Sequence, residues 1–174
     1  GDRFWRADAV EVIEKSPDRI TPPCPFAGPD RCGGCDFQHV TLVRQRLLKA
    51  EVVREQLARL AGLDVDVDVQ PVEGDEHGLR WRTRQRYVVR RDGGLAMRKH
   101  RSHDVVPIDD CLIARRDART PDDGSPTERV EVVETRHGVR SFRVPADGFW
   151  QVHPGAPRVL VEAVADLLSP AAGE

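Results

Sequence analysis

Four cysteines constrain this chain more than any other feature, because Cys24, Cys32 and Cys35 fall within twelve consecutive residues. Cys32 and Cys35 flank Gly33-Gly34, and glycines let the backbone curl so that both sulfurs face one centre. The fourth, Cys111, follows after a gap of 75 residues. Four thiolates can complete an all-cysteine zinc site or an iron–sulfur cluster. Spacing alone favours zinc.

Other interpretations of the cysteines are weaker. The chain shows neither a charged-then-apolar leader nor the roughly 18 apolar residues that a membrane span needs, so we expect a cytoplasmic protein without membrane association. That compartment keeps thiols reduced, which disfavours structural disulfides. Two alternatives stay open: isolated cysteines acting as small hydrophobes, and a zinc site using His39, His100 or His103. Solvated or hydrogen-bonded histidines are the simpler interpretation of those three.

Charge is distributed unevenly. The net charge is only −2, but residues 80–101 contain nine Arg and Lys residues against the single acid Asp92, a local net charge of +8. A basic segment on an otherwise acidic chain is typical of a localised anion-binding site.

Two elements follow the cysteine-rich loop. Apolar residues at near-helical spacing predict a helix over 41–61, with Thr41 as its N-cap and Gly62 as its C-terminal stop. Alternation of Leu and Val with Asp then predicts a strand over 63–69 with one acidic, solvated face.

A hairpin is predicted next, with Asp92-Gly93-Gly94 as its turn, because short hairpin loops require the positive φ that glycine accepts. Its first strand places Trp81 and Tyr87 on the core face. Same-face side chains lie about 6.5–7 Å apart, comparable to phosphate spacing along a nucleic acid. The alternative is a solvated strand whose arginines pair with acids. The arginines of the opposite face are Arg82, Arg84, Arg86 and Arg90, and the chain returns over 95–99 and 105–108.

The remaining segments are less patterned. Residues 4–13 predict a strand that closes an earlier domain, and the polar, Pro- and Gly-containing stretch 115–128 predicts a linker. Short strands are predicted over 130–134 and 141–144. A helix over 155–168 carries one apolar stripe.

Several motifs together resemble one family. Pro23-Cys24-Pro25 and the run from Cys32-Gly33-Gly34-Cys35 to His39 resemble the cluster loop of the TrmA/RumA-type RNA (uracil-C5) methyltransferases. Further matches follow in the same order. They are Ser16–Arg19 with Pro22 and Pro23 (the exit from the N-terminal TRAM domain), Trp81–Arg84 (the arginine-rich strand), Ser102–Cys111 (the approach to the fourth cysteine) and Phe149–His153 (the opening of the methyltransferase domain).

The resemblance implies particular cofactors and partners. It replaces zinc with a structural four-iron, four-sulfur cluster on Cys24, Cys32, Cys35 and Cys111. It implies S-adenosylmethionine as methyl donor, with Gln151 at the position of the family's cofactor-touching glutamine. It also implies ribosomal or transfer RNA as partner. The candidate RNA-binding residues are Arg82, Arg84, Arg86, Arg90, Arg98 and Lys99.

The expected fold class is α+β, in four parts. These are the tail of an OB-like TRAM domain (1–23), an iron–sulfur and RNA-binding central region with helix and antiparallel hairpin (24–111), a linker or shortened central region (112–140), and the incomplete start of a Rossmann-like methyltransferase domain (141–174). Family members attack uracil C6 with a cysteine thiolate. The cluster uses all four cysteines, so we expect no catalytic nucleophile or base in this chain.

We therefore interpret the chain as a monomeric fragment of an S-adenosylmethionine-dependent RNA (uracil-C5) methyltransferase, inactive alone. Two alternatives stay open. One is a non-catalytic, metal-stabilised RNA-binding module, and the other is a zinc-ribbon interaction protein with no RNA role.

Overall fold

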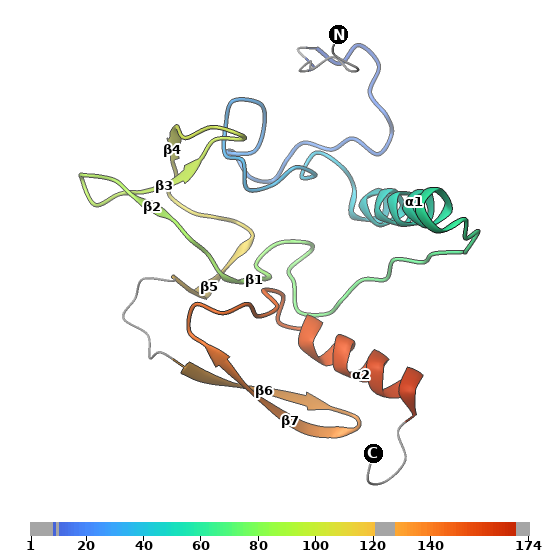
Figure 1. Cartoon of the computed structure of the whole chain (residues 1–174). Coiled ribbons are helices and arrows are strands. Elements are labelled where there is room, and N and C mark those ends of the chain that lie inside the picture. Colours follow the sequence, from blue (N-terminus) through green and yellow to red (C-terminus); the bar gives the residue numbers. More distant parts are fainter. Residues whose placement is uncertain (1–8, 10, 121–127, 170–174) are drawn as a thin grey trace. The chain divides into compact units, whose positions relative to one another are not determined.

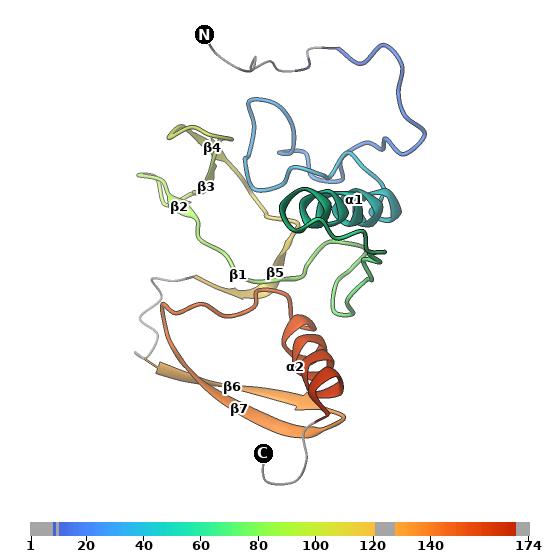
Figure 2. The same cartoon turned by 45° about the vertical axis from the view of Figure 1, so that its right-hand side comes forward.

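The computed structural model describes residues 9, 11–120 and 128–169 (Figures 1 and 2). The chain divides into two compact units. The first is built from residues 1–69 and 88–110, and the second from residues 70–87 and 111–174. The range 24–111 therefore contributes to both units. None of the described helices is long and apolar enough to span a lipid bilayer.

Helix α1 (Leu42–Ala61) confirms the prediction for this region. The Thr41 hydroxyl accepts a hydrogen bond from the Arg44 N–H at 3.4 Å, which satisfies one of the free amides of the first turn. At the other end Gly62 adopts a φ of 65°, and its N–H donates to the carbonyl of Ala58. That left-handed conformation ends helices and suits glycine.

The strand predicted over 63–69 is wrong. Where the structure describes the chain, this segment pairs with no strand. Instead Arg54 of α1 donates to the Val67 carbonyl at 3.3 Å and lies 3.9 Å from the Asp66 carboxylate. Alternating polarity does not make a strand without a neighbour to complete the hydrogen-bond ladder.

The first unit contains an antiparallel sheet in the order β2-β3-β4, made of β2 (Val88–Val89), β3 (Leu95–Arg98) and β4 (Val105–Pro107). Ala96, in the central strand, is fully buried. The two predicted return strands are confirmed, each shorter than expected.

The β2–β3 turn is also confirmed. Arg90 and Gly94 are joined by a backbone hydrogen bond of 2.8 Å, Gly93 has a φ of 81°, and the Asp92 carboxylate accepts from the Gly94 N–H at 3.0 Å. The glycine supplies a backbone conformation that side chains disfavour.

The second unit contains a pair that the sequence analysis missed. β1 (Arg82–Arg84) runs parallel to β5 (Ala114–Arg119). Part of the predicted linker over 115–128 is therefore a strand, and residues 121–127 lie outside the described chain. Polar composition suggested a linker, but Ile113 and Ala114 are buried and anchor the strand.

The rest of the second unit confirms the prediction of two strands and a helix. β6 (Glu128–Thr135) pairs antiparallel with β7 (Gly138–Pro145), and α2 (Ala156–Leu168) lies beside them (Figures 1 and 2). Val133 in β6 and Val144 in β7 are buried. Much of the α2 stripe stays exposed in the described structure, Leu167 to 86%.

The strand predicted over residues 4–13 lies mostly outside the described residues. Residues 9 and 11–13, which are described, belong to no strand. The turn that follows is present, because the Arg19 N–H donates to the Ser16 carbonyl at 3.0 Å.

Candidate functional site

The cysteine loop is organised by its own backbone. All four cysteines are thiols, each partly buried. The Cys24 N–H donates to the Gln38 side-chain oxygen at 3.1 Å, and the Cys32 N–H donates to the Phe26 carbonyl at 3.0 Å. These bonds hold two of the thiol-bearing residues in defined positions along the loop.

The same loop is fastened to the end of β3. The Gly33 N–H donates to the Arg98 carbonyl at 3.0 Å, and Cys32 forms an isolated β-bridge with Lys99. A Cβ at Gly33 would lie 2.6 Å from His100 Cα, too close for any side chain. The glycine between the paired cysteines therefore allows close approach of the 98–100 backbone.

The structure does not confirm the predicted metal site, although part of the loop would suit one. Thiols that are partly buried on a glycine-containing loop suit thiolate-binding metals. However, among the described residues no group of three or more His, Cys, Asp or Glu side chains is gathered to hold a metal. Cys111 belongs to the second unit, where its carbonyl accepts from the Ala114 N–H at 2.9 Å. The four-sulfur site therefore stays a prediction.

Two of the alternative zinc ligands have polar neighbours. His100 Nδ1 lies 3.8 Å from the Asp36 carboxylate, and His103 Nδ1 lies 3.3 Å from the Arg98 guanidinium. The His103 contact is consistent with a hydrogen-bonded histidine, whereas the separation at His100 is longer than a hydrogen bond.

The arginines of the predicted strand do not form one continuous row. β1 ends at Arg84 in the second unit, whereas β2 begins at Val88 in the first unit. The Arg82 N–H donates to the Ile113 carbonyl at 2.8 Å, so β1 is committed to β5. The prediction of a single long strand is wrong, because the first part of the segment forms its backbone hydrogen bonds in one sheet and the last part forms them in another.

Two of these arginines bind backbone within their own unit. The Arg84 guanidinium donates to the Gly148 carbonyl at 2.9 Å, and Arg82 Nε donates to the Arg84 carbonyl at 3.1 Å. Both side chains are half-buried, whereas Arg86 is exposed. Their guanidinium groups thus contribute hydrogen bonds to the fold of the second unit.

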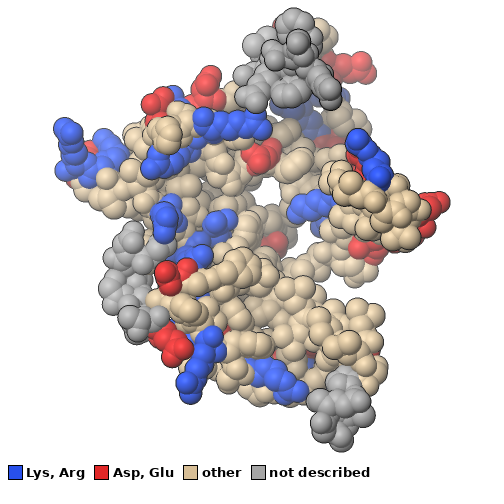
Figure 3. Space-filling model, viewed as in Figure 1, with Lys and Arg blue, Asp and Glu red and all other residues tan. Residues whose placement is uncertain are grey.

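The first unit carries the other candidate cations. Figure 3 shows Lys and Arg side chains standing out at the β2–β3 hairpin. Arg90 forms an ion pair with Asp92 at 2.7 Å, and Arg98 contacts His103. In the part of the chain that the structure describes, the Lys99 and Arg101 side chains have no polar partner. These groups remain available to an anion.

The segment 148–155 carries Gln151 and is held by β1. The Thr83 N–H and hydroxyl both donate to the Val152 carbonyl, at 2.8 and 3.1 Å. Arg84 binds the Gly148 carbonyl on the other side of Gln151. Gln151 is half-exposed, and its side chain makes no hydrogen bond with the described residues. An amide in this state suits contact with a polar ligand.

His153 lies in a partly apolar contact. Its ring stacks on Trp81 with centroids 6.1 Å apart, and the Arg82 guanidinium lies 5.9 Å from the Trp81 ring. Burial lowers the pKa of His153 below its ordinary value, while Asp75 opposes that shift. Its Nδ1 accepts a hydrogen bond from the Gly155 N–H at 3.2 Å. The neutral ring is the form that this bond requires.

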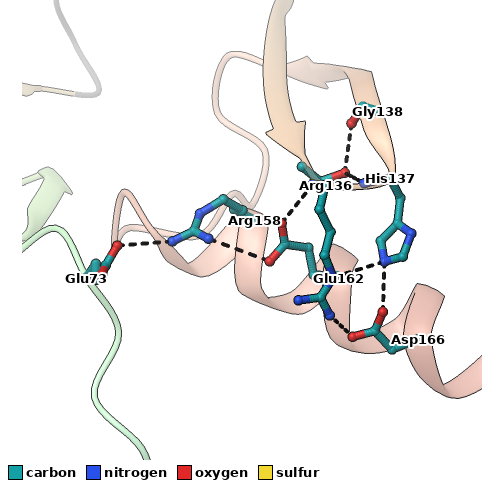
Figure 4. Close-up of polar contacts among 8 residues, drawn as sticks. Glu73, Arg136, His137, Gly138, Arg158, Glu162 and Asp166 are labelled. Atoms are coloured by element: carbon teal, nitrogen blue, oxygen red, sulfur yellow. Dashed lines mark hydrogen bonds and ion pairs between the residues drawn. The ribbon is translucent and has the colours of Figure 1, made fainter.

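A polar network fixes the β6–β7 turn to α2 (Figure 4). Arg136 forms an ion pair with Asp166, and His137 Nε2 lies 2.8 Å from the same carboxylate. The Arg136 N–H donates to Glu162 at 3.0 Å, and Arg158 lies 3.6 Å from Glu162. The sequence analysis missed this network, although acids four residues apart on a helix offered a signal.

No protein-family profile matches the chain. An "uncharacterized RNA methyltransferase" of Streptomyces coelicolor is 40% identical over 100% of this chain and 52% of its own length. A protein of the same description from Bifidobacterium longum is 33% identical over 97% of this chain and 50% of its own length. The chain thus spans about half the length of the curated relatives it matches.

A relative with a more specific name matches part of the chain. The 23S rRNA (uracil(1939)-C(5))-methyltransferase RlmD of Shewanella amazonensis is 39% identical over 65% of this chain and 26% of its own length. The alignment with the Streptomyces coelicolor protein extends over 237 positions, more than the 174 residues of this chain. Within the aligned region, that relative therefore carries additional residues that have no counterpart in this chain.

Proposed function

We propose that the chain belongs to the TrmA/RumA-type family of RNA methyltransferases and that it is part of an enzyme that methylates uracil C5 in ribosomal or transfer RNA. The observation that carries the proposal is the similarity along the whole chain to a protein described as an RNA methyltransferase. The match to RlmD supports the finer assignment to uracil C5.

The proposed reaction uses S-adenosylmethionine as methyl donor. A cysteine thiolate adds to uracil C6, which makes C5 nucleophilic toward the methyl group. A base then removes the C5 proton, and the bond between C6 and sulfur breaks to release the thiolate and restore the C5–C6 double bond. We assign neither the thiolate nor the base to this chain. Its proposed share is to contact the cofactor through Gln151 and to bind RNA.

Methyl transfer is tested with the full-length protein that contains this chain. We expect radiolabel from the methyl group of S-adenosylmethionine to enter unmodified ribosomal or transfer RNA and to appear in 5-methyluridine after nuclease digestion. Label in another nucleoside would reject the uracil-C5 assignment. RNA binding without any methyl transfer would favour a non-catalytic RNA-binding module.

We propose that Cys24, Cys32, Cys35 and Cys111 hold a four-iron, four-sulfur cluster with a structural role. The support is the thiolate donor set, together with the backbone bonds that position the 24–35 loop. Protein purified without oxygen is expected to be brown, with broad visible absorption and equal amounts of iron and sulfide. Replacing Cys32 with Ser should remove most of the colour. Colourless wild-type protein containing stoichiometric zinc would contradict this proposal.

We also propose that cations of both units bind RNA phosphates: Arg82, Arg84, Arg86, Arg90, Arg98 and Lys99. Arg98 and Lys99 offer the cleaner test, because Arg84 already binds a backbone carbonyl. Replacing both by Ala should weaken RNA binding at least threefold. The salt dependence should also become shallower, by about 0.7 in log–log slope for each lost contact to single-stranded RNA.

The matched control is the double variant Lys49→Ala, Arg59→Ala on α1, which removes the same charge from exposed positions. Filter binding at several salt concentrations compares the three proteins. Equal affinities and equal slopes in both double variants would show that Arg98 and Lys99 do not contact RNA.

A further inference from the structure

We infer that Thr83 and Arg84 are positioning residues for Gln151, so that β1 presents a cofactor-binding segment in addition to any role toward RNA. This inference rests on the proposed function, because it assigns the purpose of the contacts to S-adenosylmethionine binding. It differs from the sequence-based expectation, in which the arginines of this strand face a nucleic acid.

The contacts bracket Gln151 on both sides. Arg84 donates to the carbonyl of Gly148, three residues before Gln151, and Thr83 donates twice to the carbonyl of Val152, the residue directly after it. A hydrogen bond from a charged donor is stronger than one between neutral groups. The backbone around Gln151 is therefore held at two carbonyls while its amide side chain is left for a ligand.

The far end of the segment is fixed by close packing. Gly155 lies against the backbone of Glu73, and a Cβ at Gly74 would lie 2.9 Å from Pro154 Cγ. The stacking of His153 on Trp81 adds a ring contact between the same two stretches of chain. Both ends of the 73–84 stretch, residues 73–74 and 81–84, thus contact the 148–155 segment.

β1 is itself firmly held. The Arg82 N–H donates to the Ile113 carbonyl at 2.8 Å, and the Gln85 N–H donates to the Arg119 carbonyl at 2.9 Å. Gln85 is only 5% exposed. A ligand-contacting side chain gains affinity when its support is ordered before binding, because less conformational entropy is lost. β1 provides such support for Gln151.

The test uses the full-length protein and measures S-adenosylmethionine affinity by isothermal titration. Arg84→Ala should raise the Kd about tenfold, since it removes a charge-assisted bond, and Arg84→Lys should recover part of that loss. Thr83→Val should have a smaller effect, because the backbone N–H remains. Arg116→Ala is the control, since Arg116 is exposed on β5 of the same unit and should leave the Kd unchanged.

Two further readouts separate positioning from a general loss of folding. Hydrogen–deuterium exchange should be faster in the 148–153 backbone of Arg84→Ala, while α1 and β6 keep wild-type protection. In a Gln151→Ala background the effect of Arg84→Ala on the Kd should disappear, because no side chain remains to be positioned.

The outcomes are distinct. Wild-type S-adenosylmethionine affinity in Arg84→Ala would overturn the inference, as would an equal loss in both Gln151 backgrounds. If the wild-type protein does not bind S-adenosylmethionine at all, the proposed function fails as well. In that case the inference is judged by hydrogen–deuterium exchange alone. An unchanged exchange rate of the 148–153 backbone in Arg84→Ala would show that the Arg84 contact does not order this segment.

Discussion

Gly155→Ala is expected to destabilise the second unit by about 3 kcal/mol, within the range for overpacking at a site that cannot relax. A Cβ at this position would overlap the carbonyl oxygen of Glu73 and lie 2.9 Å from Val72 Cγ1. The φ of Gly155 is −82°, which alanine adopts freely, so the cost is purely steric. Because one obstacle is backbone, no change of rotamer relieves it.

Thermal and urea unfolding of the variant measure this loss. The control is Gly62→Ala, where a Cβ meets no atom within 4 Å but φ is 65°. That variant should lose only about 1 kcal/mol, the usual cost of a left-handed conformation for alanine. Equal losses in the two variants would mean that the contact between Gly155 and Glu73 does not form.

Gly33→Ala is expected to destabilise the first unit by about 2 kcal/mol or more. Its Cβ would lie 2.6 Å from His100 Cα and 2.7 Å from the His100 amide nitrogen, so the cysteine loop and the 98–100 backbone must separate. That separation breaks the 3.0 Å bond from the Gly33 N–H to the Arg98 carbonyl. The amide of residue 33 should therefore exchange with solvent much faster in the variant.

The neighbouring glycine offers a matched control. A Cβ at Gly34 would lie 3.5 Å from Cys32 Sγ and 3.5 Å from Met97 Cε, which is ordinary contact. Gly34→Ala should leave stability within about 0.5 kcal/mol of wild type, or raise it slightly by restricting the unfolded chain. Unfolding midpoints and amide exchange compare the two variants. If Gly34→Ala is the more damaging change, the loop is packed differently from the structure.

Local patterns predicted local elements well. The near-helical apolar spacing with Thr41 and Gly62 gave α1 within one residue at its start and the observed residue at its end. Asp92-Gly93-Gly94 correctly predicted a hairpin turn, and the two strands before the last helix were also found. In each case the determining interactions lie within a few residues along the chain, so the sequence contains them.

Predictions that needed a distant partner failed. Residues 63–69 alternate like a strand but have no strand beside them in the described chain, whereas the polar residues 115–119 form β5 because β1 is there to pair with them. Pairing between segments about 30 residues apart depends on which strands meet, and periodicity does not encode that choice.

The candidate site shows the same division. The sequence by itself singled out the thiol-rich loop and the basic segment, because the chemistry of a side chain is readable without its surroundings, and the family resemblance added Gln151 as a candidate. Only the tertiary structure decided that Arg84 turns to the Gly148 carbonyl and that Thr83 holds Val152. A guanidinium can donate hydrogen bonds to a backbone carbonyl as well as to a phosphate, and the fold determines which acceptor lies within reach.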